Sequence, residues 1–323
     1  MAFYIGVDIG GTNIKAGVVG ERGNIVGEAD LPTGADRPQE VVFGDIVETV
    51  RRAVAASGIP REGLLAAGVG CPGTVVPSSG VVVYNNNLGW KDFPLGKLLS
   101  GALSLPVRVE NDANAAALGE VCAGSAKGAS SAMILTLGTG VGSGFVVDGR
   151  IWTGWNSAAS EFGHMVIVQG GRLCTCGRRG CLEAYASATG LIAMTREAMA
   201  AHPESLMNAL AAEEGRVGGH TPFAAAERGD ATALRVTDAY LEHLACGVTN
   251  LINGLQPEVI SLGGGVGKQG ERLLEPLRQK VYAEVYGGRG ERFTRLVSCT
   301  LGYKAGLIGA AMAAMQSLTE DRD

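Results

Sequence analysis

The chain contains two strand–glycine turn–strand units, and this repetition constrains its fold more than any other feature. In the first unit an apolar strand, Phe3 to Asp8, runs into paired glycines and leads to two more strands around a turn at 21–24. Roughly 130 residues later the apolar strand 132–137 also runs into glycines, and a further strand meets a hairpin turn at Asp148-Gly149. We interpret the two units as structurally related halves.

Strands and helices alternate along the rest of the chain, which predicts an α/β fold. Apolar residues at steps of four after Pro38 indicate a helix that stops at Gly58, and the apolar run 64–69 indicates a buried strand. The later elements that we expect are a helix with one apolar face over 241–255, a strand over 258–262 and an alanine-rich helix from 305 to roughly 318.

A chain of 323 residues is too long for one ordinary core, so we predict two domains with a cleft between them, where small ligands tend to bind. The expected small α/β domain combines residues 1–111 with the C-terminal helix 305–323. The expected large α/β domain spans residues 112–304.

The charge and the termini exclude several classes of function. A net charge of −5 provides no basic field for nucleic acid or anionic lipid. The first residues lack the basic region of a signal peptide, and the longest later apolar run, 306–315, is half a membrane span. We therefore expect a cytoplasmic protein that binds neither nucleic acid nor membrane.

Three glycine turns, each at the end of a strand, are candidates for binding a phosphate donor. Glycines let the backbone approach a ligand and present its N–H groups, and the hydroxyl and lysine of the first turn suit phosphate oxygens. We place Asp8 near a bound Mg²⁺, through water. The predicted donor-binding residues are Asp8, Gly10, Gly11, Thr12, Asn13 and Lys15 in the first turn, Gly138, Thr139 and Gly140 in the second, and Gly263, Gly264 and Gly265 in the third.

Two other interpretations of these turns remain open. The first turn is also compatible with an ordinary glycine hairpin. The third contains Gly265-x-Gly267-x-x-Gly270, which fits the dinucleotide fingerprint, but no following strand ending in an acid supports it.

A carboxylate at Asp112 follows a short strand and precedes an alanine-rich helix. Asp112 is well placed either to cap that helix or to accept a proton from a sugar hydroxyl. The helix dipole would keep it ionised with a low pKa, which is no obstacle because phosphoryl transfer needs positioning more than a strong base.

One histidine and three cysteines have the composition of a closed zinc site. His164, Cys174, Cys176 and Cys181 form a Cys₃His set with no open position, so the predicted zinc-binding segment 164–181 is structural. Such a site would tie Glu161 to Glu183 and aim both carboxylates into one pocket. Free thiols beside a lone histidine are the alternative.

These features, in this order, resemble the ROK family of sugar kinases and related repressors over nearly the whole chain. The resemblance rests on Asp8-x-Gly10-Gly11-Thr12, Glu110-Asn111-Asp112, Glu161-x-Gly163-His164 and the cysteine segment ending at Glu183. The run Ala186-Ser187-Ala188-Thr189-Gly190 looks most like the glucokinases of that family.

The resemblance implies an actin-like, ribonuclease-H-like two-domain fold that closes over a hexose and ATP. It implies that Asp112 is the base acting on the C6 hydroxyl, and that the family's frequent dimers, or a homotetramer, are the expected assembly. The sugar-binding residues that it implies are Gly73, Asn87, Asn111, Asp112, Glu161, His164 and Glu183. Because Asn85, Asn86 and Asn87 are consecutive, the register of the asparagine is open by one.

The alternatives to an ATP-dependent glucokinase concern the sugar acceptor, the phosphate donor and the class of protein. Mannose, fructose, allose or N-acetylmannosamine could replace glucose, and polyphosphate could replace ATP. A sugar-sensing repressor of the same fold is the rival from another class. It would need a winged helix-turn-helix, yet the first expected strand begins at Phe3.

Overall fold

The computed structural model describes residues 2–85, 87–287 and 293–320. Its strands are β1 (Phe3–Ile9), β2 (Asn13–Gly20), β3 (Ile25–Pro32), β4 (Leu64–Cys71), β5 (Thr74–Val76), β6 (Val81–Asn85), β7 (Trp90–Phe93), β8 (Val107–Asn111), β9 (Ser131–Leu137), β10 (Val141–Val147), β11 (Arg150–Ile151), β12 (Val259–Gly263) and β13 (Arg295–Ser298). Its α-helices are α1 (Gln39–Ser57), α2 (Leu95–Leu103), α3 (Asp112–Ala123), α4 (Glu183–Ala186), α5 (Ala188–Ala201), α6 (Leu206–Glu213), α7 (Thr221–Glu227), α8 (Ala231–Leu255), α9 (Gly264–Gly267), α10 (Glu271–Glu284) and α11 (Lys304–Glu320).

The first sheet has the order β3-β2-β1-β4-β8. β1 pairs antiparallel with β2 and parallel with β4, and β4 pairs parallel with β8. β1 and β4 are almost continuously buried, as expected for strands covered on both faces. Since β1, β4 and β8 run in the same direction, their carboxyl ends meet at one edge, and that edge holds several of the residues predicted for the site.

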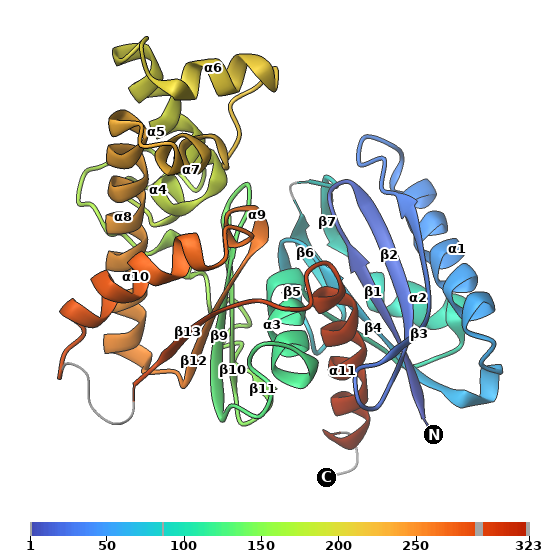
Figure 1. Ribbon diagram of the computed structural model, residues 1–323. Coiled ribbons are helices and arrows are strands. Elements are labelled where there is room, and N and C mark those ends of the chain that lie inside the picture. The colour runs from blue at the N-terminus through green and yellow to red at the C-terminus, as the bar shows by residue number, and fades with distance from the viewer. Residues whose placement is uncertain (1, 86, 288–292, 321–323) are drawn as a thin grey trace. The chain divides into compact units, whose positions relative to one another are not determined.

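Helices cover the first sheet on both faces (Figure 1). α1 packs on β2 and β3, whereas α3 and α11 pack on each other and on β4 from the other side. The sheet and α11 approach so closely that a Cβ added at Gly68 would overlap the backbone carbonyl of Ala310. Gly68 of β4 therefore allows backbone-to-backbone packing with α11 that a larger residue at this position would prevent.

The second sheet has the order β11-β10-β9-β12-β13. In each sheet the first three strands, counted along the chain, lie side by side in reverse order, and the remaining two strands of that sheet follow on the other side of the first. This shared order confirms that the two strand–glycine turn–strand units belong to structurally related halves. The Asp148-Gly149 turn between β10 and β11 has positive φ at both residues, as a two-residue hairpin requires.

Contacts between Cα atoms group the chain into two compact units. Unit 1 comprises Met1–Ile134, Gly144–Ser160 and Thr300–Asp323, and unit 2 comprises Leu135–Ser143 and Glu161–Cys299. The grouping keeps α3 with the first sheet because α3 packs on α11, whereas the predicted domain boundary lies at 111/112. The predicted C-terminal helix corresponds to α11 up to residue 320, and residues 321–323 of the prediction lie outside the described part.

Most of the expected elements are present. α1 ends at Gly58 in the left-handed conformation, with φ of 66°, as the sequence predicts. A small three-stranded sheet, β5-β6-β7, and the helices α5 to α7 and α10 had no counterpart among the predictions. Among the described residues, no helix combines the length and the apolar character needed to cross a lipid bilayer.

Candidate functional site

The carboxyl edge of the first sheet collects the predicted acidic residues of unit 1. Asp8 lies beside Gly70 in the pairing of β1 with β4, and Cys71 lies beside Asn111 in the pairing of β4 with β8. Asp112 follows directly as the first residue of α3. Three neighbouring parallel strands thus bring Asp8 and Asp112, which are far apart in sequence, to the same edge.

Asn111, not Asp112, caps α3, so the capping interpretation of Asp112 is wrong. The Asn111 side-chain oxygen accepts hydrogen bonds from the backbone N–H groups of Ala113, at 2.9 Å, and Asn114, at 3.2 Å. We expected the helix dipole to give Asp112 a low pKa, but burial outweighs the nearby backbone N–H groups and raises it. The carboxylate is therefore a stronger proton acceptor than an exposed aspartate.

The environment of Asp8 also disfavours its ionised form. Burial is the main cause that raises its pKa to about 6, the charge of Asp112 adds to this, and Lys15 opposes it. α11 begins against this carboxyl group, since a Cβ added at Gly306 would lie 2.9 Å from the Asp8 carboxyl carbon. Two partly buried carboxylates that repel each other are oxygen ligands of the kind that suits Mg²⁺.

The first glycine turn exposes part of its predicted phosphate-binding set. The turn is closed by a backbone hydrogen bond of 2.9 Å from Gly10 N–H to the Asn13 carbonyl, and Gly11 and Thr12 are exposed. The Asn13 amide donates to Asp30 at 2.9 Å.

The Lys15 ammonium lies 4.4 Å above the ring centroid of Tyr303. Sequence reasoning missed Tyr303, and no local pattern singles it out because it reaches Lys15 from the far end of the chain.

Three residues predicted to bind sugar have contacts in unit 1. The Asn111 amide donates to the Gly73 carbonyl at 3.1 Å. Asn87 is exposed, and its backbone N–H donates to the side-chain oxygen of the buried Asn85 at 2.9 Å. Asn85 is therefore a structural residue that shapes this loop, while Asn86, the other candidate for the register, lies outside the described residues.

The second and third glycine turns lie next to each other in unit 2. The second is closed by a hydrogen bond of 3.0 Å from Gly138 N–H to the Gly140 carbonyl. A Cβ added at Gly264, in the third turn, would lie 2.6 Å from the carbonyl carbon of Leu137. Gly264 also has a φ of 77°, so glycine is required there both by space and by backbone conformation.

The four predicted metal ligands form a compact cluster in unit 2. One ligand atom from each of His164, Cys174, Cys176 and Cys181 lies within 4.8 Å of all the others. His164 Nδ1 is 3.6 Å from the Cys174 sulfur, and the sulfurs of Cys176 and Cys181 are 3.7 Å apart. A zinc–sulfur bond of about 2.3 Å implies tetrahedral edges of roughly 3.8 Å, so the donor set and its spacing fit Zn²⁺.

Glu183 connects this cluster to the second glycine turn. One of its oxygens accepts a hydrogen bond of 2.8 Å from the Thr175 hydroxyl, and the other accepts one of 3.1 Å from Val141 N–H. Gly140 leaves room for the Glu183 carboxylate, because a Cβ added there would lie 2.4 Å from a Glu183 carboxylate oxygen and would displace that side chain. Glu161 is exposed and precedes the 3₁₀ turn Phe162–His164 that carries the histidine ligand.

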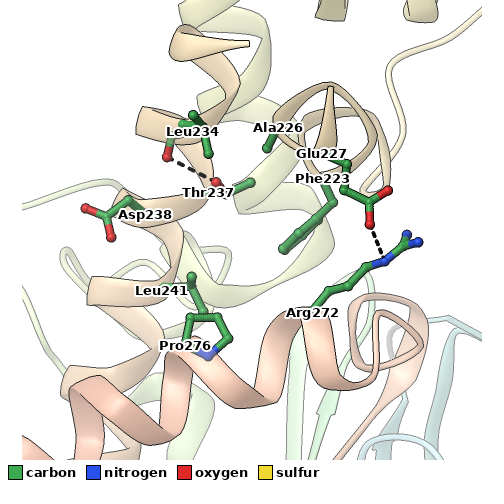
Figure 2. Close-up of a pocket in the computed structure, with 9 residues that line it drawn as sticks. All are labelled: Phe223, Ala226, Glu227, Leu234, Thr237, Asp238, Leu241, Arg272 and Pro276. Carbon is green, nitrogen blue, oxygen red and sulfur yellow. Dashed lines mark hydrogen bonds and ion pairs between the residues drawn. The ribbon is translucent and has the colours of Figure 1, made fainter. Parts of the chain in front are cut away.

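Two pockets of different character lie in unit 2. One, of about 300 Å³, contains predicted site residues in its wall, among them Thr139, Cys174 and Glu183. The other, of about 350 Å³, lies between α7, α8 and α10 (Figure 2). Phe223 and Leu241 line it, with the Glu227–Arg272 ion pair at one side, and its wall includes none of the predicted site residues.

Comparison with known proteins places these features in a family. Residues 4–317 match the ROK family. The chain is 38% identical to a glucokinase of Halalkalibacterium halodurans, over 97% of this chain and 95% of that protein. It is also 29% identical to the xylose repressor of Caldicellulosiruptor bescii, over 86% of this chain and 69% of that protein.

A solved structure supports the same assignment. The crystal structure of a ROK family glucokinase from Streptomyces griseus, in complex with glucose and AMPPNP, matches with a TM-score of 0.81 and 34% identity, over 98% of this chain and all of that chain. This match confirms the predicted actin-like two-domain α/β fold. The chain belongs to the ROK family.

Proposed function

We propose that this protein is a glucokinase that transfers the γ-phosphoryl group of ATP to the C6 hydroxyl of glucose. Its similarity to glucokinases over nearly its full length supports the proposal, as does the bound glucose and AMPPNP of the Streptomyces griseus relative. The structural observation that carries it is the Asp112 carboxylate, which lies at a sheet edge, has a raised pKa and is not the cap of α3.

In the proposed reaction Asp112 accepts the proton of the C6 hydroxyl. The sugar oxygen forms its bond to the γ-phosphorus as the bond from phosphorus to the ADP oxygen breaks, and ADP leaves with that electron pair. Phosphoryl transfer depends mainly on positioning and on charge stabilisation, so the task of Asp112 is to orient the hydroxyl and receive its proton.

The glycine turns are the proposed site for ATP. The exposed backbone of Gly11 and Thr12 and the turns at 138–140 and 263–265 supply N–H groups and open space, and Lys15 supplies positive charge. Asp8 would hold Mg²⁺ through water, and the bound ion would neutralise charge on the phosphate oxygens. The mutual repulsion of Asp8 and Asp112 supports a cation at this edge of the sheet.

The proposed glucose contacts are the seven residues that the family resemblance implies. The residues that would bind the sugar hydroxyls are Gly73, Asn87, Asn111, Asp112, Glu161, His164 and Glu183. We also propose that His164 and the three cysteines hold a structural Zn²⁺, because four protein ligands leave no open position for water. The ion would fix the loop that precedes Glu183 and would take no part in the chemistry.

Three alternatives to this proposal concern the sugar acceptor, the phosphate donor and the class of protein. Another hexose could replace glucose, polyphosphate could replace ATP, and a repressor activity would require specific binding to duplex DNA at physiological salt. We further propose that the protein acts as a homodimer or homotetramer, which light scattering would measure.

The test is the release of ADP from Mg²⁺–ATP in the presence of millimolar hexoses, one at a time. Strong turnover with glucose, weaker turnover with mannose and none without sugar is the expected result. Absence of turnover with every hexose and every donor, together with specific DNA binding, would replace the kinase proposal with the repressor.

A further inference from the structure

The run Ala186-Ser187-Ala188-Thr189-Gly190 forms the junction of α4 and α5, and most of its polar groups have a clear structural task. The buried Tyr240 hydroxyl of α8 donates to the Ala186 carbonyl at 2.7 Å. The Ser187 hydroxyl caps α5 by accepting from Gly190 N–H at 3.0 Å. These two contacts anchor the start of α5 in the core of unit 2.

The next two residues, Ala188 and Thr189, both contact the second glycine turn. The Ala188 N–H donates to the Gly138 carbonyl at 2.8 Å, and the Thr189 hydroxyl donates to the Thr139 carbonyl at 2.8 Å. Two consecutive carbonyls of the turn are therefore directed toward the first residues of α5.

This arrangement determines where the N–H groups of the turn point. In a trans peptide group the N–H points away from the carbonyl of the same plane. Holding the carbonyls of Gly138 and Thr139 against α5 therefore directs the N–H groups of Thr139 and Gly140 to the opposite side. Within the described residues neither N–H has an acceptor. Successive N–H groups that point to one side form a concave site for an anion.

The end of the turn is fixed independently, because Val141 N–H donates to Glu183. The contact from Ala188 is backbone to backbone, so only a substitution by proline would remove it, and proline would also change the backbone at the start of α5. The Thr189 hydroxyl is thus the side chain through which the turn's geometry can be tested. We propose that Thr189 is a positioning residue for the phosphate donor: by holding the Thr139 carbonyl, it aims the N–H of Gly140 at a phosphate oxygen.

This inference rests on the proposed function, in which the second turn binds ATP. The test measures the dissociation constants of AMPPNP and of glucose by calorimetry in the wild type and in Thr189→Val, which keeps the shape but lacks the hydroxyl. We expect AMPPNP to bind about fivefold more weakly, the value of one neutral hydrogen bond, and glucose binding to be unchanged. Hydrogen exchange in residues 138–141 should also become faster in this variant.

Two control variants separate positioning from a general effect on the helix. Thr189→Ser keeps the hydroxyl and should restore AMPPNP binding to within twofold of the wild type. Thr195→Val removes a buried hydroxyl from the same helix, one that donates at 2.7 Å to the Leu191 carbonyl of α5 itself, and should leave AMPPNP binding unchanged.

The outcomes distinguish this inference from the proposed function. Wild-type phosphorylation of glucose with equal AMPPNP binding in Thr189→Val would overturn the inference and leave the kinase intact. Wild-type binding of AMPPNP without phosphorylation of any hexose would overturn the function, while the comparison of variants would still decide the role of Thr189. A wild type that binds no nucleotide would overturn both.

Discussion

The two sheets share a strand order but carry different functional groups at the carboxyl ends of their strands. Where β1 and β8 end, Asp8 and Asp112 are partly buried carboxylates with raised pKa values. Where β9 ends, the second glycine turn is held by hydrogen bonds to Glu183 and to the start of α5, and where β12 ends, the third glycine turn packs against Leu137. At the first edge, burial disfavours the ionised form of two carboxylates. At the second, hydrogen bonds fix the direction of the backbone polar groups of the turn.

The difference suggests that the two units have different roles, one in the chemical step and the other in positioning. A buried ionised carboxylate lowers stability, so its retention in unit 1 is explained by chemistry or by a bound cation. Hydrogen-bonded turns stabilise one geometry, so those of unit 2 are suited to positioning. Substitutions in the first region should therefore impair catalysis without loss of stability, and those in the second should reduce stability or affinity while the chemical step persists.

The largest effect is expected for Asp112→Asn, which removes the proposed base. Turnover should fall by about 10²- to 10⁴-fold, the typical contribution of general base catalysis, while the dissociation constant of glucose changes little. Steady-state kinetics and calorimetry measure the two quantities. Near-normal turnover would contradict the role of Asp112 and would remove the distinction between the two regions.

The pH dependence of thermal stability in the same variant provides a second test of the comparison. Because the folded-state pKa of Asp112 is raised, its stabilising contribution is present at low pH and is lost as the pH rises through that pKa. Asp112→Asn should therefore unfold at a higher temperature than the wild type at pH 8, and this advantage should shrink as the pH is lowered. A thermal midpoint below that of the wild type at pH 8 would contradict the raised pKa.

The next effect is expected for Cys181→Ser, which removes a ligand from the cluster of unit 2. The metal content should fall from about one zinc per chain to near zero, and the free energy of unfolding should fall by at least about 2 kcal/mol, since metal binding is coupled to folding. Elemental analysis and denaturant unfolding measure these. Cys246→Ser, in α8, is the control and should keep its metal. Wild-type protein without metal would refute the zinc site.

A smaller effect is expected for Gly140→Ala in the second turn. The added Cβ would overlap the Glu183 carboxylate, so the free energy of unfolding should fall by roughly 1–2 kcal/mol. Gly138→Ala is the matched control, because its Cβ would have no atom within 4 Å. Equal unfolding midpoints for the two variants would show that the turn is not held against Glu183.

The smallest effect is expected for Thr175→Val. This change removes the hydroxyl that donates to Glu183, so the KM for glucose should rise about fivefold, with kcat little changed. Thr175→Ser keeps the hydroxyl and should behave like the wild type. A fall in kcat at constant KM would place this region in the chemical step and would contradict the division between the two units.

Local patterns predicted much of the fold. The strand that ends at Asp8, the helix that stops at Gly58 and the Asp148-Gly149 hairpin depend on periodicity and turn chemistry within a few residues. The His164 and cysteine cluster was also predictable, because its ligand types and short spacing are specific for a metal.

Other features depend on packing between distant segments and were not predictable. Asn111 and Asp112 are both suitable caps for α3, and the choice depends on where β8 stops pairing with β4. Thr189 was noticed only as part of a resemblance, since its partner Thr139 precedes it by 50 residues. The grouping of α3 with unit 1 depends on α11, nearly 200 residues away in the chain.

The position of α11 has a consequence for how the protein is made. α11 covers β1 and β4, yet it is synthesised after all of unit 2. While the ribosome is still translating unit 2, the α11-facing surface of the first sheet lacks its cover. The nascent chain must therefore keep an apolar, strand-rich surface from aggregating until residues 304–320 emerge, a period in which chaperones would be most useful.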